Sequence, residues 1–334
     1  MANGTYATYG TYEAAARWFV QVARRQEDWL TGRMKNKAAI NRRDFVKQTA
    51  LAALAASVSP ALAAEKKLPW KFCAFEKPLL FLSYDETADL FAELGFDGIE
   101  AAVRPGGHVL PERVEEDLPK FVEALKKRGL EITILTSGIG SATQPHAEKV
   151  LRTAAKLGIK RYRTDWWSYD LKKPIWPQVE ALRPVAKELA ALNRTVGITG
   201  LYQNHAGYQR VGAAVWDIFE VIKDCDAKDL GLAFDIRHAT VESGLSWPTV
   251  FQLVKGRIGA AYFKDFTWEN RNVKTVPMGS GLVDKKYAGM LKESGFAGPI
   301  SVHVEYGEGS KDKKFFTEAF RKDFATVREW LAAG

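Results

Sequence analysis

Cysteine and histidine are scarce in this 334-residue chain, which has two cysteines and five histidines. Cys73 and Cys225 lie far apart in the sequence, and two alternatives remain open for them. An oxidising compartment would permit a disulfide bridge. Both cysteines also lie beside predicted core elements, where buried free thiols are common, and this position favours two free thiols.

Long hydrophobic runs are missing as well. The mildly apolar run at residues 49–64 is interrupted by serine and proline, and it is shorter than the roughly 20 residues that a membrane-spanning helix needs. No later segment is long or apolar enough to cross a membrane. The Gly-x-Gly-x-x-Gly motif of an open dinucleotide-binding sheet does not follow the first predicted strand. The sequence therefore predicts no stable membrane anchor and disfavours that open-sheet fold.

The N-terminal 64 residues resemble a twin-arginine export signal. Residues 41–47 read NRRDFVK, and the apolar run that follows ends in Ala-Leu-Ala at 61–63, the small-x-small pattern that a signal peptidase cuts. This order predicts a cleaved signal, a periplasmic protein and a transient partner, the twin-arginine (Tat) translocon. The alternative is an ordinary amphipathic N-terminal helix. Met34 fits the start of such a signal better than Met1 does.

The positive charge of the chain belongs mostly to this leader. Of 48 basic and 40 acidic residues in the whole chain, nine basic and four acidic ones lie in residues 1–64, so residues 65–334 carry a net charge of only about +3. This balance disfavours nucleic-acid binding. The remaining 270 or so residues suit one domain with a large core.

From residue 70 onward, short β-rich apolar runs alternate with amphipathic helical patterns. Eight such units predict an α/β fold, a closed (β/α)₈ TIM barrel that occupies residues 65–334 as a single domain. The predicted strands are 70–75, 98–103, 131–136, 160–165, 198–203, 231–235, 258–264 and 300–305. The predicted helices are 87–94, 114–127, 146–157, 177–193, 215–223, 247–254, 285–293 and 314–331.

Polar residues collect at the carboxyl ends of the predicted strands, where such barrels carry their active sites. A buried salt bridge is the alternative for a single residue such as Glu76 or Asp165, but many converging groups indicate a functional pocket. The strand-end polar residues are Glu76, Glu100, Asp165, Gln203, His205, Asp235, Arg237, His238, Lys264, Asp265, His303 and Glu305.

Several of these residues lie in motifs that resemble one family. The stretches 93–100 (ELGFDGIE), 202–206 (YQNHA), 234–238 (FDIRH), 263–265 (FKD) and 301–305 (SVHVE) are similar to the sugar phosphate isomerase/epimerase group, the xylose isomerase-like TIM barrels, as is the Gly-rich stretch 277–284 (PMGSGLVD). The resemblance implies a barrel enzyme of carbohydrate metabolism. It does not fix the reaction, because the group includes isomerases, epimerases, dehydratases, lyases and a nuclease.

The resemblance also implies a metal site with one ligand from each of the last four strands. By position these ligands are Gln203, Asp235, Tyr262 and Glu305. Asp235 and Glu305 suit Mg²⁺ or Mn²⁺, whereas a glutamine carbonyl is weaker and a neutral tyrosine is poor. His205 could supply nitrogen instead, which favours Mn²⁺, Co²⁺ or Zn²⁺.

The predicted metal ligands are therefore Asp235, Glu305, Gln203 and His205, with His238 as another nearby nitrogen donor. The alternative is a site without metal, in which Arg237 or Lys264 bridges Asp235 and Glu305.

We expect chemistry that begins with removal of a proton next to a carbonyl. Glu305 is the expected base, His205 or His238 the partner acid, and Lys264 the cation beside the developing oxyanion. Gln203 cannot accept a proton, which disfavours a symmetric two-base epimerase. A sugar isomerase or epimerase is the first hypothesis, and a lyase or hydratase acting on keto-sugars or glycosides is the second.

The expected substrate-binding residues are Glu100, Trp166, Tyr202, Arg237 and Trp268, because aromatic rings stack on sugar faces. The sequence shows no phosphate cradle, so a free sugar, keto-sugar or glycoside is favoured over a sugar phosphate. A non-catalytic carbohydrate-binding barrel remains an alternative. A multi-zinc nuclease is disfavoured by the small number of histidines.

Overall fold

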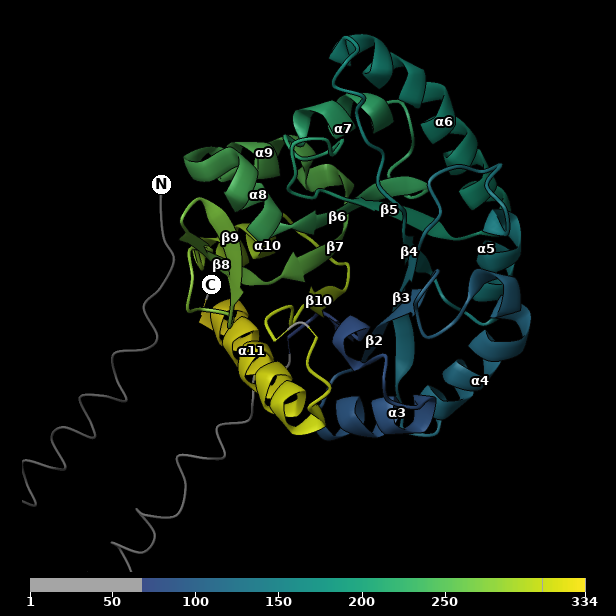
Figure 1. Ribbon diagram of the computed structural model, residues 1–334, viewed down its shortest axis with the longest axis vertical. Coiled ribbons are helices and arrows are strands. Elements are labelled where there is room, and N and C mark those ends of the chain that lie inside the picture. Colours follow the sequence, from purple (N-terminus) through teal and green to yellow (C-terminus); the bar gives the residue numbers. More distant parts are fainter. Residues whose placement is uncertain (1–67, 308, 334) are drawn as a thin grey trace, which may run out of the picture. The chain divides into compact units, whose positions relative to one another are not determined.

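The computed structural model describes residues 68–307 and 309–333, and within them eight parallel strands close into a barrel (Figure 1). Around the barrel the strands follow the order β1, β2, β3, β4, β5, β6, β7, β10, and β10 pairs back to β1. The strands are β1 (Phe72–Phe75), β2 (Gly98–Val103), β3 (Glu131–Ser137), β4 (Arg161–Arg163), β5 (Thr199–Gln203), β6 (Leu230–Asp235), β7 (Ile258–Phe263) and β10 (Ile300–Val302).

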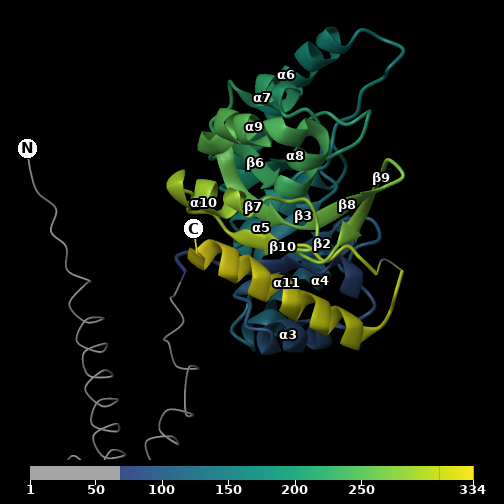
Figure 2. The same ribbon diagram turned by 90° about the vertical axis from the view of Figure 1, so that its left-hand side faces the viewer.

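Helices cover the outside of the barrel (Figures 1 and 2). Each apolar helix face packs against the strands, as the predicted amphipathic periods require. The helices are α3 (Tyr84–Glu93), α4 (Val114–Lys126), α5 (Ala147–Lys156), α6 (Ile175–Val196), α7 (Trp216–Ile222), α8 (Ile236–Ser243), α9 (Trp247–Val254), α10 (Lys286–Glu293) and α11 (Lys313–Ala333). Four short 3₁₀ turns complete the described helical elements: η1 (Lys77–Leu79), η2 (Pro111–Arg113), η3 (Gly244–Ser246) and η4 (Lys255–Arg257).

The closed barrel confirms the predicted fold class. Two elements were not predicted. An antiparallel hairpin, β8 (Asp265–Glu269) with β9 (Asn272–Val276), projects from the barrel after β7. Helix α8 begins directly after β6, with the Asp235 side chain accepting the His238 backbone N–H at 3.2 Å. Neither element is separated from the preceding strand by a turn residue such as glycine or proline. For that reason the sequence pattern indicated only loops at these positions.

A small apolar cluster fills the interior of the barrel. Its members lie on the strands and are fully buried: Cys73, Ile134, Leu201, Ala233, Ala260 and Tyr262. Inward positions nearer the carboxyl ends of the strands are polar instead. Since burying a polar group without a partner is costly, this change along the strands places the site at that end of the barrel.

Cys73 and Cys225 are free thiols, both buried, as favoured from the sequence. Within the described residues no helix combines the length and apolar character needed to cross a membrane. The predicted export signal at residues 41–64 lies outside the described residues.

Candidate active site

Lys264 is the centre of the polar cluster. It directly follows β7, and its side chain is only 2% exposed. Its Nζ atom lies 3.1 Å from Oδ2 of Asp235, the last residue of β6, and 3.1 Å from Oε1 of Glu305, which follows β10. Arg237, in the first turn of α8, donates from Nη1 to Oε2 of Glu305 at 3.1 Å. Residues from four elements thus bring two carboxylates and two cations together.

Gln203, the last residue of β5, completes this layer. Its Nε2 donates to Asp235 Oδ2 at 2.7 Å, and its Oε1 accepts a hydrogen bond from Nη1 of Arg163. Arg163 ends β4, and its guanidinium also lies against the Trp166 ring, 4.9 Å from the ring centroid. The orientation of the Gln203 amide is therefore fixed at both ends, with its donor end toward Asp235.

A second layer of buried polar residues, around Glu100 and His303, lies deeper in the barrel than the layer around Lys264. Glu100, from β2, accepts hydrogen bonds at Oε2 from Ser301, at 2.8 Å, and faces His303 Nε2 at 3.0 Å. Its Oε1 accepts from Thr136 and Tyr262. The other His303 nitrogen, Nδ1, lies 3.8 Å from Glu305 Oε1. His303 thus connects the two layers.

Two histidines line one side of the cluster. The His205 and His238 rings are in contact, with centroids 3.9 Å apart and planes tilted by 36°, and Trp166 packs edge-on against His205 at 4.6 Å. His238 is buried, and its ring nitrogens have no hydrogen-bond partner among the described residues. Both nitrogens therefore lack the hydrogen bond that a buried polar atom normally makes.

Electrostatics assign the protonation states of the cluster. Burial lowers the pKa of His205 to about 4, with help from the Lys264 charge, and the same two causes hold the pKa of His238 well below its usual value. Burial by itself would raise the pKa of Glu305, but the charges of Lys264 and His303 hold it well below the usual range. At neutral pH the site therefore has neutral imidazoles at His205 and His238 and an ionised Glu305.

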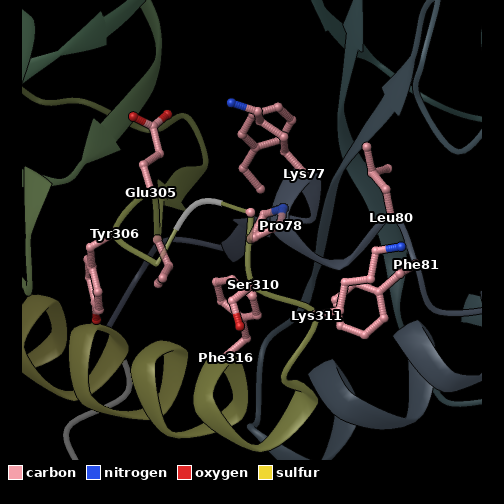
Figure 3. A pocket seen from close by; sticks show the side chains of 12 residues that line it. Lys77, Pro78, Leu80, Phe81, Glu305, Tyr306, Ser310, Lys311 and Phe316 are labelled. Carbon is pink, nitrogen blue, oxygen red and sulfur yellow. The ribbon is translucent and has the colours of Figure 1, made fainter.

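An open cavity of about 240 Å³ adjoins Glu305 (Figure 3). Aromatic side chains including Phe75 and Phe316 line it together with Lys311, and the Glu305 side chain stands at its edge. The Glu305 side chain is 24% exposed, whereas Asp235 is fully buried. Of the two carboxylates that Lys264 bridges, Glu305 is therefore the one that a ligand can reach.

A family model, described as "Xylose isomerase-like TIM barrel", matches residues 88–331. The chain belongs to this family. Curated proteins give no match. Among solved structures, the IOLI protein with a bound zinc atom has a TM-score of 0.64 at 17% identity, over 79% of this chain and 98% of that one.

Two further structural neighbours of this xylose isomerase-like barrel have assigned reactions. The 3-keto-D-glucoside 4-epimerase YcjR from E. coli has a TM-score of 0.59 and 16% identity, covering 78% of this chain and 99% of that chain. A protein from Bacillus anthracis, described as the probable 3-DHS dehydratase AsbF, has a TM-score of 0.59 and 15% identity, covering 77% and 98%. At these identities the likeness shows the shared fold.

The residues predicted as metal ligands do not fit a divalent ion in the arrangement observed. Asp235 and Glu305 are bridged by Lys264, and the Gln203 oxygen is directed to Arg163. His205 Nδ1 lies 2.8 Å from the Ala206 carbonyl oxygen. In the part of the chain that the structure describes, no group of three or more His, Cys, Asp or Glu residues is arranged to hold a metal. The arrangement matches the alternative in which a basic side chain bridges the carboxylates.

The structure brings together most of the predicted site residues, namely Glu305, Asp235, Lys264, His205, His238, Gln203, Arg237 and Trp166. Glu100 is adjacent but fully buried with both oxygens occupied, so it cannot bind substrate directly. Its contact with the upper layer runs through His303.

The prediction for Tyr202 is corrected. Its ring stacks on Trp167, and its hydroxyl donates to the Val211 carbonyl and accepts the Trp167 N–H. Neighbouring residues of a strand point to opposite sides, so Gln203 faces the barrel interior and Tyr202 faces the helix layer. Trp268 is 50% exposed on the β8–β9 hairpin and packs against Phe266 rather than in the cluster.

Arg163 belongs to the site but was missed, and His303 was counted among the strand-end polar residues without being given a role in the site. Each lies at the end of its strand with its side chain toward the barrel interior. The alternation of side chains along the strand was the sequence signal that could have identified both residues. Glu76 is a buried ion-pair partner, as its alternative supposed, with an oxygen 3.0 Å from His108.

Asp265 holds the Gly-rich loop. Its two oxygens accept backbone N–H groups from Phe266, Gly279, Gly281 and Val283 at 2.8–3.0 Å. A Cβ atom at Gly281 would lie 2.3 Å from Asp265 Oδ1. These amides are directed to a carboxylate of the protein itself, so they do not form a phosphate cradle.

Proposed function

We propose that this protein is a carbohydrate enzyme that removes a proton from a carbon next to a carbonyl, as a sugar isomerase or epimerase does. The observation that carries this proposal is the partly exposed, ionised Glu305 carboxylate beside the buried Lys264 ammonium. A carboxylate of this kind can accept a proton from carbon, and the cation next to it can stabilise the enediolate oxygen that forms.

The charge movement in this reaction suits the geometry. When a substrate proton moves to Glu305, its negative charge is lost there and reappears on the carbonyl oxygen of the substrate. Lys264 has three N–H donors, and two of them face Asp235 and Glu305. The third donor can meet the new oxyanion, so the ammonium remains next to a negative charge throughout.

The histidines contribute as neutral groups. The lowered pKa values of His205 and His238 mean that neither is an imidazolium acid at neutral pH. His238 can still donate a hydrogen bond from one ring nitrogen to a substrate hydroxyl or carbonyl oxygen, as neutral imidazoles do in other enzymes. The Nδ1–H of His205 donates to the Ala206 carbonyl, so its neutral Nε2 can only accept a hydrogen bond from a substrate hydroxyl. Trp166 beside His205 supplies an aromatic surface for a sugar ring.

Elimination is the second candidate, favoured by Gln203. A two-base epimerase needs proton acceptors on both faces of the substrate, and Gln203 is an amide bonded to Asp235 and Arg163. A single accessible base suits loss of a β-leaving group from a keto-sugar or glycoside. The cavity beside Glu305 could hold that group.

Metal assistance, which the family resemblance implies, would require Asp235, Glu305, Gln203 and His205 to exchange their present partners for the ion. We derive no step through a metal.

Incubation with free sugars, keto-sugars and glycosides in D₂O, followed by product NMR, tests the proposal. We expect deuterium at the carbon beside the carbonyl, and an unsaturated product or a released leaving group would identify elimination. Glu305→Gln should lower turnover by roughly 10²–10⁴-fold while sugar binding persists. Glu269→Gln, at an exposed pair with Lys274, is the control. Sugar binding without turnover or deuterium exchange in the unaltered protein would indicate a binding barrel instead.

We also propose export through the twin-arginine pathway, on the strength of residues 41–63. Fusing residues 34–64 to a fluorescent protein that folds before export tests it. Periplasmic fluorescence should be lost when Arg42 and Arg43 are both changed to lysine. Cytoplasmic fluorescence from the unaltered fusion would contradict the proposal.

A further inference from the structure

The two carboxylates that would attract a metal ion already share one cation. Asp235 ends β6 and Glu305 follows β10, on strands separated by β7 in the barrel. Lys264, at the end of β7, places Nζ 3.1 Å from an oxygen of each. The cation is supplied by the intervening strand, so the barrel itself fixes its position.

The charges of the cluster balance without any added ion. Its carboxylates are Asp235, Glu305 and Glu100, and its permanent cations are Lys264, Arg237 and Arg163. A divalent ion would need the same carboxylate oxygens at roughly 2.0–2.6 Å. It would therefore have to displace a buried ammonium or lie against it, and repulsion in a buried site is poorly screened.

The other two strand positions of the implied ligand set, Gln203 and Tyr262, are also committed. Gln203 presents an N–H group, not its oxygen, to Asp235. Tyr262 donates its hydroxyl to Glu100, in the deeper layer. Amide orientation matters here, because the Gln203 oxygen could face Asp235 only by breaking its hydrogen bond from Arg163.

We propose that the Lys264 ammonium replaces the divalent cation in this barrel, so that the site excludes metal and works without it. That Lys264 stabilises the enediolate oxygen rests on the proposed function, whereas the exclusion of metal does not. In the reaction, the C–H electron pair becomes the C=C bond and the carbonyl pair moves to oxygen beside Lys264. Glu305 takes up the proton, exchanges it with solvent and returns a proton to carbon, and nothing is oxidised or reduced.

Titration of the purified full-length protein with MnCl₂, by calorimetry and by metal analysis after dialysis, tests the exclusion. The unaltered protein should bind no stoichiometric Mn²⁺, and its thermal unfolding should be unchanged by EDTA. One Mn²⁺ per chain that is lost in Asp235→Asn would overturn the proposal. Neither outcome depends on substrate, so failure of the sugar assay leaves this result standing.

Lys264→Ala shows whether Lys264 is what excludes the ion. Without the ammonium, Asp235 loses its cation and Glu305 keeps only Arg237, so Mn²⁺ should bind tighter than to the unaltered protein by a factor of roughly 10 or more. Lys264→Gln is the second variant, should alanine not fold. Lys274→Ala, which removes an exposed lysine paired with Glu269, is the matched control. A folded Lys264 variant that still binds no Mn²⁺ would overturn the role given to Lys264.

Discussion

Glu100 Oε2 and His303 Nε2 lie 3.0 Å apart inside the barrel, and both side chains are fully buried. The other His303 nitrogen, Nδ1, faces Glu305, so the Glu100–His303 pair is in contact with the accessible carboxylate of the site from deeper in the barrel. A buried carboxylate and imidazole in contact depend on each other, because either one alone would be a desolvated polar group.

Glu100→Gln should destabilise the protein. Burial alone would raise the pKa of Glu100, but His303 and Arg163 lower it from 4.5 to about 2. A lowered folded pKa means that this stabilisation is present above about pH 4.5 and is lost as the pH falls toward 2. We expect a loss of roughly 3–5 kcal/mol in the free energy of unfolding near pH 6, measured by urea denaturation.

The same substitution should also remove the part of the pH dependence of stability that comes from His303. Contact with Glu100 raises the pKa of His303 against the effect of burial, so the histidine contribution is present below pH 6.5 and is lost as the pH rises through its folded value. Glu131→Gln, at an exposed pair with Lys71, is the control and should cost less than about 1 kcal/mol. Equal losses for the two variants would contradict the pairing.

His205 should stay neutral through the physiological range. Burial and the charge of Lys264 lower its pKa to about 4, so its imidazole should gain a proton only below about pH 5. An NMR titration of ring resonances measures this, with His205→Asn used to assign the signal. A midpoint near pH 6.5 would show that the ring is solvated rather than packed against His238.

Tyr202→Phe should affect stability and not sugar binding. The change removes the hydroxyl that bonds with Val211 and Trp167 on the outer side of the barrel wall, and we expect a loss of about 1–3 kcal/mol. Trp166→Ala is the contrasting variant, because Trp166 packs against His205 in the site. It should weaken sugar affinity in a titration followed by tryptophan fluorescence. Weaker binding in Tyr202→Phe would restore Tyr202 to the site.

Asp265→Asn should loosen the Gly-rich loop. One carboxylate oxygen accepts the N–H groups of Gly279 and Gly281, and in asparagine one of the two oxygens becomes an N–H₂ donor. We expect faster hydrogen exchange at residues 279–283 and a loss of about 1–3 kcal/mol. Asp226→Asn, at an exposed turn where one N–H from Lys228 is accepted, is the control. Unchanged exchange in the loop would show that other contacts hold it.

The barrel could be predicted because its evidence is local. Apolar residues at helical spacing and short β-rich runs recur eight times, and each unit can be recognised within about 30 residues. Convergence of strand-end residues then followed from topology, since parallel strands in a barrel end at one rim. This reasoning correctly assembled Asp235, Lys264 and Glu305.

The side of a strand to which each side chain points was harder to predict. Tyr202 and Gln203 are adjacent and were both assigned to the site, although strand alternation permits only one of them to face inward. Arg163 was passed over because the strand was expected to run to Asp165, two residues further along and on the same face, whereas β4 ends at Arg163. The β8–β9 hairpin was missed since it begins directly after β7 with no turn residue between them.

The sequence by itself determined the barrel, its single domain and the set of charged groups at one rim. Only the tertiary structure decided which of those groups pair, and in particular that Lys264 stands between Asp235 and Glu305. Pairing depends on distances of a few ångströms between residues 29 and 41 positions apart, and hydrophobic periodicity carries no information about such distances. The same reason explains why a metal site and a lysine-bridged site read alike in the sequence but differ in the folded molecule.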